Sequence, residues 1–296
     1  MKIVLTGGTG FIGRHVSEFF VNRGDEVIII TRKAPDNAKK GITYVEWDKI
    51  SKQKPLMERT DAVINLAGAT INQRWSKQGK ERILQSRLKS TSQLAALLSE
   101  LEQVPKVVIN ASAIATYGTS VSDTYIESSP TRVTDFLADV VQQWEQAADQ
   151  IPCERLVKLR LGLVLGKDGG ALGKIVLPYR LAAGGRIGSG KQWYSWIHID
   201  DLVALLDYCI THDNLRGPVN ATAPSPVTND EFGRTVAQIL RKPHWLPVPS
   251  FALKLMLGEM SMLVLEGQRV LPAKAQQSGF HFKYPKLKAA LTNLLG

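Results

Sequence analysis

Residues 1–13 read MKIVLTGGTGFIG and combine an apolar run, a glycine-rich turn and the start of a helix-like segment. Its KIVLT segment is a compact apolar run typical of a buried strand, and residues 14–22 carry apolar side chains at helical spacing. Between strand and helix, Gly7 allows a tight turn, Gly10 lets the backbone approach a pyrophosphate, and Gly13 lets the helix pack closely. The N–H groups at the start of such a helix bind phosphate, so this stretch predicts a dinucleotide site.

Apolar runs alternate with helix-like segments along the first half of the chain. We expect strands at Lys2–Thr6, Glu26–Ile30, Thr43–Trp47, Ala62–Leu66, Val107–Ala111 and Leu156–Leu161, and helices notably at Lys80–Glu102 and Asp135–Gln150. The alternation predicts an α/β protein with a Rossmann-type, doubly wound parallel sheet. Beyond Gly166 the pattern gives way to Gly-rich and Pro-rich segments. We expect residues 1–166, joined by 196–222, to form a Rossmann-type dinucleotide-binding domain, and residues 167–296 to form mainly a smaller substrate-binding lobe.

The composition is that of a globular protein, with 296 residues, 44% hydrophobic and 22% charged. Lys and Arg number 37 and Asp and Glu 27, a net charge of +10. Because the basic residues are scattered, a small anionic substrate is favoured over nucleic acid as the partner. A nucleic-acid-associated protein remains a weaker alternative.

Cysteine content and apolar patterning indicate the cellular setting. Only Cys153 and Cys209 occur, which excludes a disulfide framework and fits a reducing compartment. The apolar stretch Phe251–Leu265 is too short to span a membrane and predicts a buried or amphipathic helix. The N-terminus runs straight into the glycine motif without a full signal region. We therefore expect a cytoplasmic protein with no membrane partner.

The end of the second strand indicates which dinucleotide is bound. NAD sites usually place an acidic residue there to hold the ribose hydroxyls, but this chain reads Ile30-Thr31-Arg32-Lys33. Arg32 can hold a 2′-phosphate with its planar fork, Thr31 can donate from its hydroxyl, and Lys33 adds a charge. The sequence therefore predicts NADP(H). The alternative is a pair of solvated loop cations.

Further motifs follow in order along the chain. They are Asn65-Leu66-Ala67-Gly68, Ser86-Arg87, Asn110-Ala111-Ser112-Ala113 with Tyr117-Gly118, Gly169-Gly170-Ala171, Gly188-Ser189-Gly190, Trp196-Ile197-His198-Ile199-Asp200-Asp201 and Glu266-Gly267-Gln268-Arg269-Val270-Leu271-Pro272. With the TGGTGFIG turn, this series resembles the extended short-chain dehydrogenase/reductase family. More narrowly, it resembles the YfcH-like "epimerase family protein" group.

The resemblance implies cofactor contacts for a set of residues along the carboxyl ends of the strands. The set comprises Gly7, Thr9, Gly10, Phe11, Ile12 and Gly13 in the turn, Trp47 and Asp48 beside the adenine, Leu66, Ala67 and Gly68 along the adenosine and pyrophosphate, Arg87 on a helix, and Leu163 and Val164 beside the nicotinamide. Other interpretations are that Trp47 is a packed aromatic, Leu66 a core residue and Arg87 a surface cation. The resemblance also implies a homodimer formed by a pair of helices.

The chain departs from the family at the catalytic pair. The family uses a Tyr followed four residues later by a Lys, on a helix that carries a downstream Glu. If Glu145 is that Glu, Leu137 stands at the Tyr position and Val141 at the Lys position. The only Tyr-x-x-x-Lys spacing, Tyr284 with Lys288, lies in the C-terminal tail, and we interpret it as coincidence.

Other groups are then candidates for acid–base catalysis. Ser112 matches the Ser/Thr position of the family, although counting from Tyr117-Gly118 puts Ala113 there instead. Tyr117, Glu127 and His198 are the remaining candidates. Each has a structural alternative, as strand-end packing, a loop carboxylate and a hydrogen-bonded core histidine respectively.

Residues 184–193 combine glycines with Arg186, Lys191 and Trp193 and predict a substrate-binding loop that meets a phosphate or carboxylate. A solvated turn is the alternative. Two functions remain open: an NADP(H)-dependent oxidoreductase or epimerase acting on a small, sugar-nucleotide-like substrate, and an NADP(H)-binding sensor with little turnover. Arg269 either joins the substrate pocket or braces the lobes.

Overall fold

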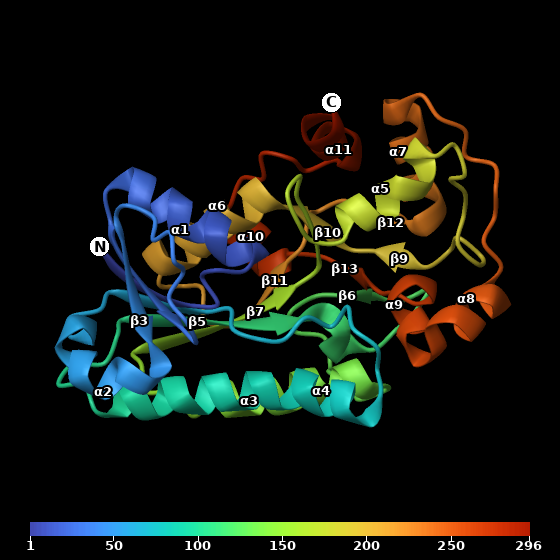
Figure 1. Ribbon diagram of the computed structural model, residues 1–296. Coiled ribbons are helices and arrows are strands. Elements are labelled where there is room, and N and C mark those ends of the chain that lie inside the picture. Colours follow the sequence, from blue (N-terminus) through green and yellow to red (C-terminus); the bar gives the residue numbers. More distant parts are fainter.

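The computed structural model describes all residues, 1–296, and is built around a seven-stranded sheet (Figure 1). The strand order is β11-β7-β5-β4-β1-β2-β3, and every neighbouring pair is parallel. The strands are β1 (Lys2–Thr6), β2 (Glu26–Thr31), β3 (Ile42–Glu46), β4 (Ala62–Asn65), β5 (Val107–Ala113), β7 (Arg155–Leu161) and β11 (Gly217–Ala221). The order reverses beside β1, as in doubly wound dinucleotide-binding sheets. The predicted fold class is confirmed.

Helices cover both faces of this sheet (Figure 1). On one face lie α1 (Phe11–Arg23), α6 (Ile199–Thr211) and α10 (Ala273–Gln277), and on the other lie α3 (Lys77–Ser99) and α4 (Phe136–Ala148). Alternate residues of β1 enter opposite cores: Ile3 and Leu5 pack in the first, Val4 in the second. This alternation follows from the period of two in a strand. After β3 come the short helices η1 (Trp47–Lys49), α2 (Ile50–Gln53) and η2 (Lys54–Met57), and after β5 comes η3 (Ile114–Tyr117).

A second lobe has its own apolar core, in which α5 (Leu172–Arg180), α7 (Asn229–Leu240) and α11 (Leu287–Leu295) pack together. Short strand pairs link it to the sheet domain: β8 (Leu163–Leu165) with β10 (Trp196–His198), β9 (Trp193–Tyr194) with β12 (Val227–Thr228), and β6 (Thr124–Tyr125) with β13 (Arg269–Val270). The chain crosses between the lobes repeatedly. Residues 196–222 supply α6 and β11 to the sheet domain, and Ala275 and Phe280 return to its core. None of the helices is long and apolar enough to span a membrane.

The stretch Phe251–Leu265 is not one helix. It is divided into α8 (Ser250–Leu257), a 3₁₀ turn η4 (Gly258–Ser261) and α9 (Met262–Leu265), and Gly258 at the break has a φ of 57°. The expectation of a buried helix is wrong for α8, because none of its residues is buried. In Figure 1, α8 lies at the outer edge of the second lobe.

Candidate functional site

In the turn between β1 and α1, a side chain at Gly7 or Gly13 would overlap backbone atoms. Gly7 has a φ of +70°, and a Cβ there would lie 2.7 Å from the carbonyl of Leu66. A Cβ on Gly13 would lie 2.3 Å from the Gly7 carbonyl oxygen. At Gly10 the only close atom is that oxygen, at 3.3 Å, so the other side of Gly10 is open. These contacts agree with the roles predicted for the three glycines, and they leave an open cradle of the kind that a pyrophosphate fills.

The N-terminus of α1 points into this cradle. Gly10 is the N-cap residue, and no side chain caps the helix, so the N–H groups of its first turn are free for an anion. Thr9 is exposed in the turn, and Ile12 lies partly buried on the sheet-domain core. Phe11 has a second partner that sequence reasoning missed. Its ring occupies the space that Cβ atoms on Gly166, Gly169 and Gly170 would take, at 2.5, 2.4 and 3.0 Å.

The end of β2 carries two cationic side chains that have no acidic partner. Arg32 and Lys33 are exposed and take part in no salt bridge, and the Thr31 hydroxyl donates to the Lys33 carbonyl. Glu46 lies opposite Thr31 in the parallel register, but its carboxylate accepts from the Ala34 N–H and pairs with Lys49. Those contacts lower the pKa of Glu46, the Lys49 hydrogen bond having the largest effect. The acid nearby in sequence is therefore engaged, and the Arg32 guanidinium is free for a ligand.

Other predicted cofactor residues lie at the ends of neighbouring strands. Asp48 is exposed after β3, whereas Trp47 packs partly on the core below the sheet, which fits its alternative role as a packed aromatic. Leu66 and Ala67 follow β4, and Leu163 and Val164 follow β7 on β8. Parallel strands place these ends along one edge of the sheet, where ligands of doubly wound folds bind.

Arg87 lies beneath the loop after β4. Its Nη1 donates to the Ala69 carbonyl at 3.1 Å and to the Ile83 carbonyl at 2.9 Å, and its guanidinium lies 5.1 Å from the Trp144 ring centroid. A Cβ on Gly68 would lie 3.2 Å from the guanidinium carbon. Arg87 forms no salt bridge, and burial lowers its pKa to about 10. The guanidinium is thus held by carbonyl oxygens and an aromatic ring, with no acidic partner.

The two positions on α4 that the spacing from Glu145 assigns to the Tyr and Lys of the family have apolar surroundings. Leu137, in the first turn of α4, packs in a small cluster with Trp75, Ile83 and Val140. Val141 is buried. Tyr284, from the tail spacing, packs its ring against His198 in the second lobe instead. Neither α4 position holds a proton-transfer group.

The candidate Ser112 is part of a buried ionic network. Its hydroxyl donates to Oε1 of Glu145 at 2.6 Å, and Arg160 binds both oxygens of that carboxylate at 2.8 and 2.9 Å. Burial acts to raise the pKa of Glu145, but hydrogen bonds from Arg160 and Ser112 outweigh it and lower that pKa. Arg160 on β7 was not identified from the sequence, although an arginine within an otherwise strand-like apolar run was the available signal.

Tyr117 and Glu127 belong to the same network. The Tyr117 hydroxyl donates to Oδ1 of Asn220 at 2.8 Å and accepts from Arg160 at 2.9 Å, and burial raises the pKa of Tyr117. Oε1 of Glu127 accepts from the backbone N–H groups of Asn220 and Lys274. Its Oε2 is buried without a hydrogen-bond partner. Among the candidates described so far, Glu127 alone retains an unengaged polar atom.

His198 is the N-cap residue of α6. Its Nδ1 accepts from the Asp200 N–H at 3.0 Å, which requires the neutral ring to carry its proton on Nε2. Nε2 then donates to Oδ1 of Asn293 at 3.1 Å. Burial lowers the pKa of His198 and favours this neutral form. Both nitrogens are thus occupied, as the core-histidine alternative expected.

Hydrogen bonds fix the backbone of the predicted substrate loop, whereas its two cationic side chains are exposed. Gln192 donates to the Ile187 and Val264 carbonyls, and the Ile187 N–H donates to Asn229. Arg186 and Lys191 are exposed and form no salt bridges. Trp193 donates to the Val121 carbonyl, and its ring lies 5.1 Å from the Arg269 guanidinium. Arg269 thus braces β13 against β9.

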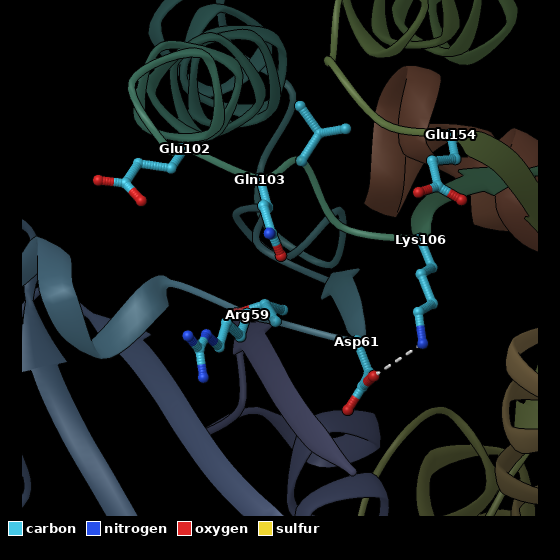
Figure 2. A pocket seen from close by; sticks show the side chains of 8 residues that line it. Arg59, Asp61, Glu102, Gln103, Lys106 and Glu154 are labelled. Atoms are coloured by element: carbon cyan, nitrogen blue, oxygen red, sulfur yellow. Dashed lines mark hydrogen bonds and ion pairs between the residues drawn. The ribbon is translucent and has the colours of Figure 1, made fainter.

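A pocket of about 510 Å³ lies at the opposite edge of the sheet (Figure 2). Its lining includes Asp61 and Lys106, which precede β4 and β5 and form an ion pair at 3.4 Å. Because ligands of doubly wound sheets bind at the carboxyl ends of strands, this pocket at the amino ends is not the cofactor site.

The reversal of strand order, the glycine cradle and the free helix N-terminus together define a dinucleotide-binding protein of the Rossmann type. Comparison with known proteins narrows this class. Residues 3–221 match the model of the NAD dependent epimerase/dehydratase family, and residues 248–294 match a domain of unknown function, DUF1731. The chain belongs to the NAD dependent epimerase/dehydratase family.

Relatives match over nearly the whole of this chain. Epimerase family protein YfhF of Bacillus subtilis is 42% identical over 298 residues, spanning 100% of this chain and 98% of that protein. The crystal structure of human epimerase family protein SDR39U1 (isoform 2) with NADPH is 36% identical, covers 99% of both chains and has a TM-score of 0.91. A nucleoside-diphosphate sugar epimerase from Corynebacterium glutamicum is 30% identical, with a TM-score of 0.80, over 100% of this chain and 58% of that one. These comparisons establish an NAD(P)-binding, epimerase-like protein.

Proposed function

We propose that the protein binds NADP(H) in preference to NAD(H) and acts as an oxidoreductase or epimerase on a small anionic substrate. The observation that carries the cofactor preference is the exposed, unpaired Arg32 at the end of β2, beside Thr31 and Lys33. A free guanidinium there suits a 2′-phosphate and no carboxylate competes for it. The NADPH bound in the human relative supports the same preference.

The cofactor would be held from several sides by this chain. The N–H groups of the first turn of α1 would bind the pyrophosphate, with Gly7, Gly10 and Gly13 keeping the approach open. Arg87 would offer its unpaired charge beneath the loop after β4. Bound nicotinamide would supply hydride-transfer chemistry, and Leu163 and Val164 would shield it from water.

Arg32→Ala tests the cofactor preference. We expect it to weaken NADPH binding by about 1.5–3 kcal/mol, the range for a hydrogen bond to a charged group, and to leave NADH binding nearly unchanged. Lys40→Ala, which removes another exposed cation of the same loop region, is the matched control. Equal losses for NADPH and NADH in a fluorescence titration would contradict the assignment.

The substrate would meet Arg186 and Lys191, whose charges have no protein partner. A sugar nucleotide fits this chemistry because it carries a diphosphate. The similar structure from Corynebacterium glutamicum is that of a nucleoside-diphosphate sugar epimerase. A panel of sugar nucleotides and simpler carbonyl compounds, assayed for NADPH oxidation, tests this. Turnover that Arg186→Ala and Lys191→Ala both leave unaltered would remove the loop from substrate binding.

One observation favours a second function, an NADP(H)-binding sensor with little turnover. Ser112, Tyr117 and His198 all have their polar atoms engaged by neighbours, and Leu137 and Val141 replace the catalytic pair. Only Glu127 retains a free oxygen. Turnover that Glu127→Gln abolishes without loss of NADPH affinity would support the enzyme. Tight NADPH binding with no turnover across the panel would support the sensor.

A further inference from the structure

Large apolar side chains project into solvent along one edge of the second lobe. α5 and its end contribute two of them, the segment before α8 contributes one, and α8 contributes three. They are Leu177, Leu181, Trp245, Phe251, Leu255 and Met256, between 55% and 87% exposed. An apolar group of this kind on a globular protein marks an interaction surface.

Hydrogen bonds join these segments into one continuous edge. Nε1 of Trp245 donates to the Ala182 carbonyl at 2.9 Å, so the indole is held against the end of α5. The Gly188 N–H, in the loop after α5, donates to the carbonyl of Val248, two residues before α8 begins. A Cβ on Gly188 would lie 3.7 Å from Cβ of Ser250, the first residue of α8. Figure 1 shows this segment running from α7 down the outer edge to α8.

α8 is the least packed helix of this edge. None of its residues is buried, although all but Ser250 and Lys254 are apolar. Phe251 and Leu255 are four residues apart and therefore lie on the same face. Ala252, Leu253 and Leu257 are partly buried against this chain, whereas the face with Phe251, Leu255 and Met256 is exposed. One apolar face of α8 therefore has no packing partner within the chain.

The charge of this edge specifies the covering surface. Residues 169–199 contain four Lys or Arg and no Asp or Glu, and residues 232–258 contain another four and again no acid. Two of these eight are the substrate-loop cations Arg186 and Lys191, and Arg234 pairs with Asp230. Arg180, Arg241, Lys242 and Lys254 are exposed and form no salt bridge. The partner surface is therefore anionic.

A second copy of this chain does not fit, because pairing the same edge would bring two cationic surfaces together. The apolar side chains protrude, which suits a deformable surface better than a rigid one with preformed pockets. Exposed Trp and Phe beside Lys and Arg are the composition of helices and loops that lie in the headgroup region of a bilayer. We infer that this edge binds peripherally to membranes that contain anionic lipids, with α8 lying along the lipid surface.

Vesicle sedimentation of the full-length protein tests the inference. We expect binding to vesicles of phosphatidylcholine with phosphatidylglycerol, loss of that binding at high salt, and little binding to phosphatidylcholine alone. The double substitution Phe251→Ser, Leu255→Ser should reduce the vesicle-bound fraction at least about tenfold, because it removes two large apolar groups. Both side chains are exposed, so the fold and NADPH binding should persist.

Two further variants sharpen the test. Arg241→Glu with Lys242→Glu should abolish the preference for anionic vesicles. Val104→Ser with Val133→Ser removes apolar side chains that are 39% and 52% exposed outside this edge, and should bind as the unaltered protein does. The inference would be overturned if the protein did not bind anionic vesicles, or if the Phe251→Ser, Leu255→Ser variant bound them equally well. It would also be overturned if soluble polyglutamate captured the protein and vesicles did not. A dimer in sedimentation analysis that the Phe251→Ser, Leu255→Ser variant dissociates would overturn it as well.

Discussion

The turn after β1 and the end of β5 lie at the same edge of the sheet, but their polar groups are used differently. At the first, the N–H groups of α1 and the nearby Arg32 have no protein partner. At the second, the Ser112 hydroxyl and its neighbours are bound to one another through Glu145 and Arg160.

The difference separates binding from catalysis. A ligand site needs groups with unused hydrogen-bonding capacity, and the β1 and β2 ends supply them. The β5 and β7 ends use theirs inside the protein, where satisfied buried groups contribute to stability. The groups that a dinucleotide needs are therefore unengaged, whereas Leu137 and Val141, the positions at which the sequence predicts the Tyr–Lys pair to be missing, are packed among apolar side chains.

A substitution in the buried network around Glu145 should have the largest effect on stability. Arg160→Met would leave the Glu145 carboxylate buried without its partner, and removing one member of a buried ion pair costs about 3–5 kcal/mol. We expect the free energy of unfolding, measured with urea, to fall by that amount. Adding Glu145→Leu should recover much of the loss, since no charge then remains buried. A single variant that loses less than about 1 kcal/mol would show that the network contributes little.

On the binding side, Gly13→Ala should be the most damaging small change. Its Cβ would meet the Gly7 carbonyl oxygen and Cα of Gly8, so the turn must shift. Such overpacking costs about 1–3 kcal/mol, and NADPH affinity should fall with it because the cradle changes shape. Gly173→Ala is the matched control, because nothing lies within 4 Å of a Cβ there. Unchanged NADPH affinity in a titration of Gly13→Ala would separate the turn from the cofactor site.

The buried His198 gives the protein a pH-dependent stability. Its pKa is lowered in the folded state by burial, so the unfolded chain takes up the proton first as pH falls through about 6.5. Stability is then full above that pH and declines below it, by up to about 1.4 kcal/mol per pH unit for one proton. Urea unfolding between pH 7 and 5 should show a shallower decline in His198→Asn. Parallel profiles for the two proteins would assign the proton uptake elsewhere.

The substitution Tyr117→Phe should have the least effect on stability, and it tests whether the network at the end of β5 is structural or catalytic. Tyr117→Phe removes the hydrogen bonds to Asn220 and Arg160, at a cost of about 0.5–1.5 kcal/mol in stability for the former. If Tyr117 is structural, NADPH affinity and any turnover stay unchanged. A large loss of turnover at constant stability would instead make Tyr117 a proton donor.

Local sequence patterns predicted the sheet and the glycine turn because both depend on neighbouring residues. The KIVLT strand and the three glycines specify their structure within a few positions of the chain. The return of Ala275 and Phe280 to the sheet-domain core could not be predicted in this way, because it depends on packing between segments far apart in sequence.

The residues of the candidate site also differ in how far the sequence could predict their environment. The free cations after β2 could be identified from their position alone. The engagement of His198 by Asn293 and of Tyr117 by Asn220 could not, since the partners lie 95 and 103 residues away. Glu145 was identified only as a marker of helix position, and its pairing with Arg160 required the register of β5 and β7.

The contact between Phe11 and the three glycines of residues 166–170 joins two parts of the molecule. Phe11 begins the helix that follows the glycine cradle, and the glycines lead the chain from β8 into α5 of the second lobe. Because the Phe11 ring fills the space beside these glycines, the loop that leads into the second lobe packs directly against the first turn of α1. A side chain at Gly166 or Gly169 would overlap the ring, so this close packing between the two parts of the molecule requires glycine there.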